Sequence, residues 1–305
     1  MHRYSSTSMD KSHQLVSWNR VSLQIPSSWQ TLVSGSCHII FENDFEALLE
    51  IRWQQAAAKD FQHLSDKALQ QLQKITGKKL NKAKLSQPHK NLFRNFSAAP
   101  FSYDKGGPSI IFLYCHACSI FLMLKIYSQK NGHDPLAEIE KLQVSKADKS
   151  TFLWAIQDFR ISIPAGLDYS GHSMQAGLTS LHFSRKKVNL HICRLAPASV
   201  RLAKNTQLQI LSSLTGIEDI QQDSIASGNE VFFERSPNIA RQVQLRLQRK
   251  KPFILAVLQH KPEHDRLLGV IMESTHPINH DEFNMIFKSY EISAEKEEGS
   301  TAFTE

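Results

Sequence analysis

The sequence has few of the features that mark secreted, membrane-spanning or disulfide-stabilised proteins. Its 305 residues include four cysteines, too few for a disulfide framework in a chain of this size, so we expect reduced thiols. Its apolar runs, such as residues 110–114, are far shorter than the roughly 20 residues of a membrane-spanning helix. The opening residues are polar and hold no apolar signal core, which predicts a cytoplasmic protein.

Sequence patterns of common enzymes are also missing. The chain contains no G-x-S-x-G nucleophile elbow, no phosphate-binding P-loop and no G-x-G-x-x-G dinucleotide fingerprint. We therefore expect no enzymatic activity, and we assign no catalytic residues, no cofactor-binding residues and no cofactor.

What the sequence does contain is a repeat. Residues 21–26, Val-Ser-Leu-Gln-Ile-Pro, return 138 positions later as residues 159–164, Phe-Arg-Ile-Ser-Ile-Pro. An amphipathic helical pattern that ends at Gly77 returns 139 positions later and ends at Gly216. Two patterns of different type at nearly one offset indicate a tandem duplication. The repeat predicts one domain at 15–145 and a second at 152–293, with flexible tails at 1–14 and 294–305.

Each copy predicts mixed secondary structure. Strand-like alternation in three segments is followed by the amphipathic helix, with Asp60 as its N-cap in the first copy, then by further strands and a closing short helix. The first closing helix is expected after Asp134-Pro135, and the alternation of Val243, Leu245 and Leu247 predicts an additional strand. The predicted fold class is α+β, as two tandem copies of an α/β/α-type sandwich, each an antiparallel sheet covered by helices. The four tryptophans lie on or beside the repeated strands and are expected in the core or covering a sheet, rather than forming a stacking platform.

The segments 21–29 and 159–166 resemble the first strand of the Mog1/PsbP-like fold, whose pattern is F-x-I-x-x-P-x-G-W. The order of the strands and the long helix that follow is similar in both halves. Within that superfamily the chain is similar to Mog1 proteins, which bind a partner protein. It is also similar to the Eag-type chaperones of type VI secretion, which hold a hydrophobic segment of an effector and work as dimers. The resemblance implies a protein-binding function, in which a fused tandem imitates a dimer, and supplies no catalytic residues.

The sharpest local motif is Cys115-His116-Ala117-Cys118. A C-x-x-C pair can be a redox dithiol or half of a zinc site. The motif falls in a predicted turn between two strands, whereas a thioredoxin-type pair begins a helix, and no second pair stands at a suitable spacing. We interpret it as a hairpin turn with two partly buried thiols, and Cys115, His116 and Cys118 remain the alternative metal site.

Positive charge gathers in two places, in a chain of net charge +7. One possible basic binding patch follows the first long helix and consists of Lys78, Lys79, Lys82, Lys84 and Arg94. Nucleic-acid-binding surfaces usually interleave such residues with aromatic side chains, and only Phe93 and Phe96 lie nearby. We therefore expect a non-enzymatic protein-binding adaptor or chaperone built from two duplicated domains. The alternative is a nucleic-acid-binding protein that uses basic loops around 78–94 and 246–251.

Overall fold

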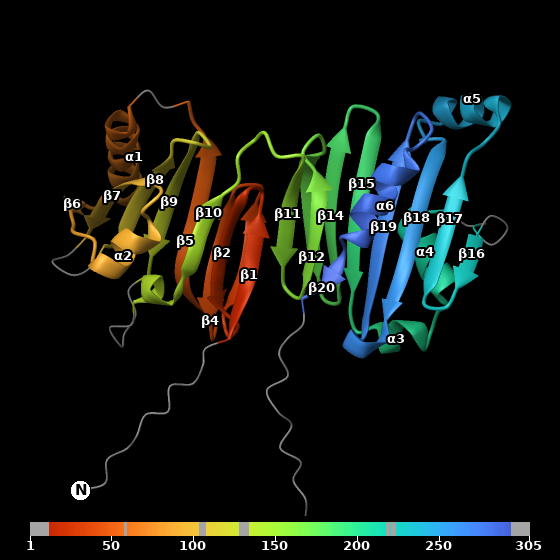
Figure 1. Cartoon of the computed structure of the whole chain (residues 1–305), viewed down its shortest axis with the longest axis horizontal. Coiled ribbons are helices and arrows are strands. Elements are labelled where there is room, and N and C mark those ends of the chain that lie inside the picture. Colours follow the sequence, from red (N-terminus) through yellow and green to blue (C-terminus); the bar gives the residue numbers. More distant parts are fainter. Residues whose placement is uncertain are drawn as a thin grey trace, which may run out of the picture. The chain divides into compact units, whose positions relative to one another are not determined.

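The computed structural model of the protein describes residues 12–57, 60–103, 108–127, 134–217, 220 and 224–293. The described chain divides into two compact units (Figure 1). Unit 1 comprises residues 12–149 and 154–158, and unit 2 comprises residues 150–153 and 159–293. The tail predicted at 294–305 and residues 1–11 of the first tail lie outside the described residues. The end of the first tail was placed wrongly, because His13 and Gln14 belong to the first strand.

Unit 1 is built on a seven-stranded antiparallel sheet of order β3-β4-β5-β9-β8-β7-β6. Strands β10, β2 and β1 form a smaller antiparallel sheet, and residues 154–156 of β11 pair with β1 through Ser17 and Ala155. The elements are β1 (His13–Trp18), β2 (Val21–Pro26), β3 (Gln30–Gly35), β4 (His38–Asn43), β5 (Glu46–Gln55), α1 (Phe61–Thr76), β6 (Asn81–Lys82), α2 (Gln87–Leu92), β7 (Ser97–Ser102), β8 (Ile110–Cys115), β9 (Ile120–Ile126), the single 3-10 turn η1 (Pro135–Glu138), β10 (Glu140–Val144) and β11 (Thr151–Ile156).

The large sheet of unit 1 is covered on both faces. On one face, Phe101, Phe112 and Phe121 pack with apolar residues of α1. On the other face lies the smaller sheet, where the Trp18 ring meets Trp154 at 4.9 Å between centroids. The prediction that the tryptophans are core residues is confirmed, because all four are buried: Trp18, Trp29, Trp53 and Trp154.

Helix α1 begins and ends where the sequence predicts. The Asp60 side chain accepts a hydrogen bond from the backbone N–H of Gln62 at 2.9 Å, as expected of an N-cap. Gly77 closes the helix in the left-handed conformation with φ +65°, and its N–H bonds the carbonyl of Gln73. The corresponding helix of unit 2 ends in the same way at Gly216, with φ +66°.

Unit 2 is built on a second seven-stranded antiparallel sheet, of order β13-β14-β15-β19-β18-β17-β16. The order matches that of unit 1 strand for strand. Helix α4 packs on one face, and α6 with β12 and β20 lies against the other. The elements are β12 (Phe159–Pro164), β13 (Asp168–Gln175), β14 (Leu178–Arg185), β15 (Val188–Leu195), α3 (Ala198–Leu202), α4 (Gln207–Thr215), β16 (Ser224–Ser227), β17 (Glu230–Arg235), α5 (Ile239–Leu247), β18 (Phe253–Lys261), η2 (Pro262–His264), β19 (Arg266–Ser274), α6 (His280–Lys288) and β20 (Glu291–Ile292).

The predicted fold class of α/β/α-type sandwiches is wrong. The structure is mostly antiparallel sheet, with 47% strand and 23% helix, and is more β-rich than such a sandwich. The excess arises because strands take places where helices were expected. In unit 1 the second face of the large sheet is covered by strands β1, β2 and β10. The segment after Asp134-Pro135 makes one 3-10 turn and then β10, with Leu142 buried in that strand.

One predicted strand is in fact a helix. Residues Val243 to Leu247 belong to α5, whose N-cap Asn238 accepts a hydrogen bond from the N–H of Arg241 at 3.0 Å. Three apolar residues at spacing two fit a strand, but residues 243 and 247 also stand four apart, as on one side of a helix. Asn238, a residue type common at helix N-caps, is the sequence feature that favours the helix over the strand.

Replacing Gly77 or Gly216 with alanine should lower the free energy of unfolding by about 1 kcal/mol. An added Cβ meets nothing within 4 Å at either site, so the cost comes from the left-handed backbone alone. Gly35→Ala is the matched control, because its Cβ also meets nothing within 4 Å and its φ lies outside the left-handed region. Urea denaturation of the three variants measures the difference, and equal losses at all three sites would contradict the explanation.

Candidate functional site

The C-x-x-C motif forms the turn of the β8–β9 hairpin, so the predicted turn is confirmed. Cys115 and Cys118 are free and buried, and the Cys118 thiol lies 3.2 Å from the carbonyl oxygen of Val144. Burial raises the pKa of Cys118 to about 12, and its hydrogen bond with Cys115 adds to the shift. A thiol with so high a pKa stays protonated at neutral pH and is a poor nucleophile.

The alternative metal site does not gain ligands from the fold. His116 is exposed at the turn, where its Nε2 lies 2.8 Å from the Ser97 hydroxyl. Among the residues that the structure describes, no three His, Cys, Asp or Glu side chains are grouped so that they could hold a metal ion. The arrangement is that of a packed hairpin turn.

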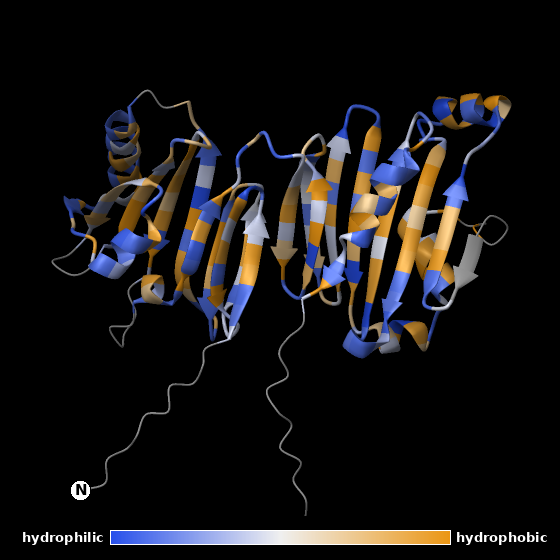
Figure 2. Ribbon diagram, viewed as in Figure 1, coloured by the Kyte–Doolittle hydropathy of each residue, from blue (hydrophilic) through white to orange (hydrophobic). Residues whose placement is uncertain are grey.

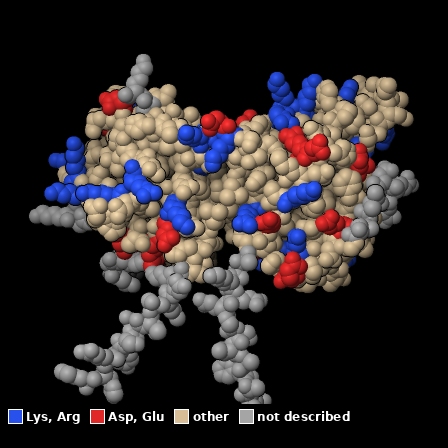
Figure 3. All heavy atoms as spheres, in the orientation of Figure 1, with Lys and Arg blue, Asp and Glu red and all other residues tan. Residues whose placement is uncertain are grey.

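The predicted basic binding patch is exposed, and the aromatic rings described near it are buried or half-buried. All five of its residues are exposed: Lys78, Lys79, Lys82, Lys84 and Arg94. Phe93 is buried, so its ring cannot stack on a base, whereas Phe96 and Tyr103 are half-buried. The Lys78 ammonium lies over the Tyr103 ring at 5.6 Å. Figure 3 shows separate groups of basic side chains, with acidic side chains among them, on the face in view.

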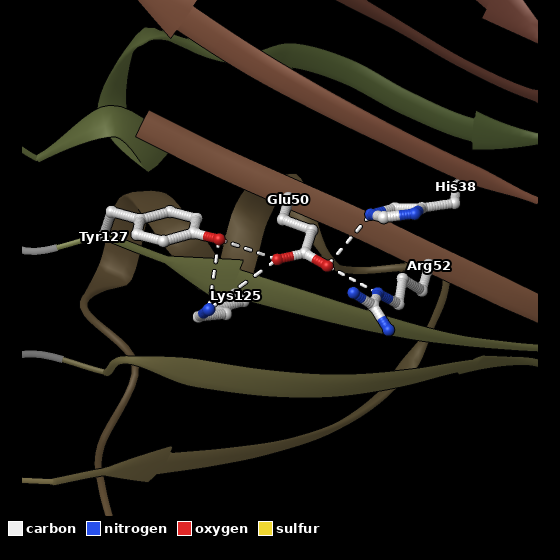
Figure 4. Close-up of polar contacts among 5 residues, drawn as sticks. All are labelled: His38, Glu50, Arg52, Lys125 and Tyr127. Atoms are coloured by element: carbon white, nitrogen blue, oxygen red, sulfur yellow. Dashed lines mark hydrogen bonds and ion pairs between the residues drawn. The ribbon is translucent and has the colours of Figure 1, made fainter. Parts of the chain in front are cut away.

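A buried carboxylate that the sequence analysis missed joins three strands of unit 1. Glu50 of β5 stands between Ile40 of β4 and Lys125 of β9 in the register of the sheet. Its side chain is 4% exposed, and four side chains converge on it (Figure 4). Tyr127 donates a hydrogen bond to Oε2 at 2.8 Å, and the Lys125 Nζ lies 3.8 Å from the same oxygen.

Two further groups meet the other carboxylate oxygen. The Arg52 guanidinium donates to Oε1, and the His38 Nε2 lies 2.9 Å from the same oxygen. Burial by itself would raise the pKa of Glu50. The hydrogen bonds from Tyr127 and Arg52, with the charges of Arg52 and Lys125, outweigh that effect and hold the pKa below its ordinary value. Glu50 is therefore ionised at neutral pH, and its arrangement suits bracing the sheet rather than proton transfer.

The corresponding position of unit 2 carries a histidine. His191 of β15 pairs with His182 of β14 and Ile271 of β19, as Glu50 pairs with Ile40 and Lys125. The Nδ1 atoms of His182 and His191 are 2.7 Å apart. Burial, with the nearby His182 and Lys251, lowers the pKa of His191 to about 4. Burial and His172 also lower the pKa of His182, so this pair is neutral where unit 1 holds an ionic cluster.

The edges of the two large sheets differ in how well they are protected. At one edge stand short strands, β6 with two residues and β16 with four. At the other edge stand β3 with six residues and β13 with eight. Strand β13 is irregular, because its register with β14 shifts between Tyr169 and Gly171. Short strands and bulges are common devices that keep an edge from pairing with other chains.

Strand β3 also has a register shift with its neighbour, between Val33 and Gly35, but it pairs regularly with β4 over residues 30–33. Its sequence, Gln-Thr-Leu-Val-Ser-Gly, has no charged residue and no proline, and its side chains alternate between exposed and half-buried. Leu32 is 44% exposed. The backbone of β3 pairs with β4. In addition, Trp18 Nε1 donates a hydrogen bond to the Gly35 carbonyl at 3.0 Å. Strand β3 stands at the edge of its sheet, and among the described residues no strand pairs with it on the side away from β4.

No protein-family model matches the chain, and no curated protein matches it. Among the described residues, none of the helices has the length and apolar character needed to cross a membrane.

Glu50→Gln should destabilise the protein by about 1–2 kcal/mol at pH 7, because the charge-assisted hydrogen bonds of the carboxylate are lost. The folded pKa of Glu50 is depressed, so its contribution is full above the unfolded pKa of 4.5 and is lost as the pH falls through the folded value. The difference in the free energy of unfolding between wild type and Glu50→Gln should therefore disappear at acid pH. Urea denaturation at several pH values measures it, with the exposed Glu46→Gln on the same strand as control. A difference in the free energy of unfolding that does not change with pH would contradict the stabilising role of the ionised Glu50 carboxylate.

The histidine pair should make unit 2 sensitive to acid. His191 has a folded pKa of about 4 against an ordinary 6.5, so the unfolded chain takes up a proton first as the pH falls. Stability should decrease between pH 6.5 and about 4, and His191→Leu should remove on the order of 1 kcal/mol of that decrease. Thermal unfolding across this range tests it, with His63→Leu on α1 as control. Identical pH profiles for wild type and His191→Leu would exclude the explanation.

Proposed function

We propose that the protein is a non-enzymatic, cytoplasmic adaptor or chaperone that binds an extended segment of a partner protein along β3. The observation that carries the proposal is the open, uncharged edge of that strand. An extended peptide that adds to a sheet edge gains backbone hydrogen bonds, and alternate side chains give specificity. Leu32, exposed on this strand, is the natural apolar contact for such a segment.

The contrast between edges supports the proposal. An open edge carries a risk of aggregation, which proteins normally remove by shortening, bending or charging the strand. The opposite edge of the same sheet is reduced to two residues, one of them Lys82. A role in binding another strand best explains why β3 is longer and uncharged. The proposal also agrees with the resemblance to Mog1 and Eag-type proteins, which bind other proteins.

Nucleic-acid binding is less well supported by the geometry. The basic residues at 78–94 lie on a loop and two short elements, where Phe93 is buried and Phe96 is half-buried. A single-strand-binding surface combines a charged groove with stacking rings. The second predicted basic loop, around 246–251, comprises the last residues of α5 and those just beyond it.

Leu32→Lys should abolish partner binding and leave the fold intact, because the new charge points from an exposed site on the edge strand. A photo-crosslinking amino acid at Ser34, also exposed on β3, captures whatever pairs with the strand in cells. The crosslinked partner should be contacted through one short segment. Once the partner is known, the β3 amides should exchange hydrogen more slowly in the complex.

Phe45→Lys is the matched control, because Phe45 is an exposed apolar residue of the same unit outside β3. It should leave crosslinking unchanged. Crosslinking that is insensitive to Leu32→Lys, or β3 amides whose exchange does not slow, would refute the proposal. Sub-micromolar binding of DNA or RNA that survives physiological salt, and is lost when Lys78, Lys79, Lys82 and Lys84 are neutralised, would favour the alternative function.

A further inference from the structure

Helix α5 of unit 2 carries an apolar stripe on its outer side. Ile239, Val243 and Leu247 are spaced by four residues and therefore lie on one side of the helix. Their side chains are 80%, 51% and 81% exposed, and the buried residue of the helix is Leu245. Figure 2 shows apolar residues along α5, beside the ends of the unit 2 strands. Burying three such side chains in water-free surroundings would be favourable.

The helix is an addition to the shared topology. It lies in the connection between β17 and β18, residues 236–252, whereas the corresponding connection between β7 and β8 in unit 1 covers residues 103–109. Because unit 1 builds the same strand order with the shorter connection, the sheet does not require α5. An apolar stripe on an insertion that the fold does not need points to a binding role.

The same segment is strongly basic. Residues 236–252 contain no aspartate or glutamate and carry five basic residues, in a chain whose net charge is +7: Arg241, Arg246, Arg249, Lys250 and Lys251. Arg246 donates to the carbonyl of Thr275 at 2.8 Å and so ties the helix to the end of β19. Lys251 is half-buried near Glu273. Arg249 and Lys250 are exposed just beyond the end of the helix.

We propose that α5 binds the surface of an anionic lipid bilayer. Ile239, Val243 and Leu247 would enter the boundary between headgroups and acyl chains, with Arg249 and Lys250 at the lipid phosphates. A short amphipathic helix with a basic flank has the two signals that interfacial helices combine, apolar area and attraction to anionic lipids. An acidic groove of a protein is the competing occupant. The bilayer fits better because Ile239 and Leu247 are 80% and 81% exposed and Val243 is 51% exposed, and insertion into lipid needs no pocket of matching shape.

The test is flotation of the full-length protein with two kinds of vesicle, phosphatidylcholine alone and phosphatidylcholine mixed with phosphatidylglycerol. The protein should float with the anionic vesicles and much less with the neutral ones, and added salt should weaken its binding. The variant Ile239→Ser/Val243→Ser/Leu247→Ser should bind at least about tenfold more weakly. Arg249→Gln/Lys250→Gln should lose most of the preference for anionic lipid.

Matched controls come from unit 1. Ile75→Ser removes an equally exposed apolar residue of α1, and Lys78→Gln/Lys79→Gln removes exposed charge elsewhere; both should bind like wild type. If the triple variant unfolds, Leu247→Ser alone, at the last residue of the helix, serves in its place. No binding of wild type to anionic vesicles at low salt would overturn the proposal. So would unchanged binding by the α5 variants, or a protein partner that needs the stripe while the vesicles are ignored.

Discussion

The antiparallel pairing of β5 with β9, matched by that of β15 with β19, is the contact on which the rest of each unit depends. It joins an early group of strands, β3-β4-β5, to a late group, β9-β8-β7-β6, and so turns two separate hairpin systems into one sheet. The helix between the groups then has a continuous apolar face to cover. In unit 1 the same pairing brings Glu50 beside Lys125, 75 positions away in the sequence.

The two units show that this central position tolerates very different chemistry. In unit 1 a carboxylate sits there with basic groups on three sides, and in unit 2 two neutral imidazoles meet edge to face. Both solutions meet the same physical demand, which is that a polar group under the sheet surface must have a partner. The ionic version adds charge-assisted hydrogen bonds, while the imidazole version avoids the cost of burying a charge.

Local features were predictable from sequence, and features that depend on register were not. Asp60 and Gly77 mark the ends of α1 because caps act over a few residues, and the hairpin turn at Cys115 follows from the strands on either side. The apolar pattern at Val243 to Leu247 fitted the strand period and the helix period equally well. Three apolar residues were too few to distinguish a strand from a helix. The class of the fold was missed because layers are made by tertiary packing: nothing near Asp134 in the sequence says that the following residues pair with β2. A glutamate inside the apolar run at Leu48 to Ile51 was a visible signal, but its partners on β4 and β9 needed the register.

The division of the chain between the units has a practical meaning for anyone who would separate them. Residues 150–153 belong to unit 2, yet the next five residues, 154–158, return to unit 1. Trp154 in that short return stacks edge-on against Trp18. A fragment that stops at Lys149 lacks Trp154 and would therefore leave the Trp18 ring without this contact. A fragment that runs to Asp158 would include residues 150–153 of unit 2. The two halves share an architecture, but along the chain the residues of unit 1 and unit 2 alternate between positions 149 and 159.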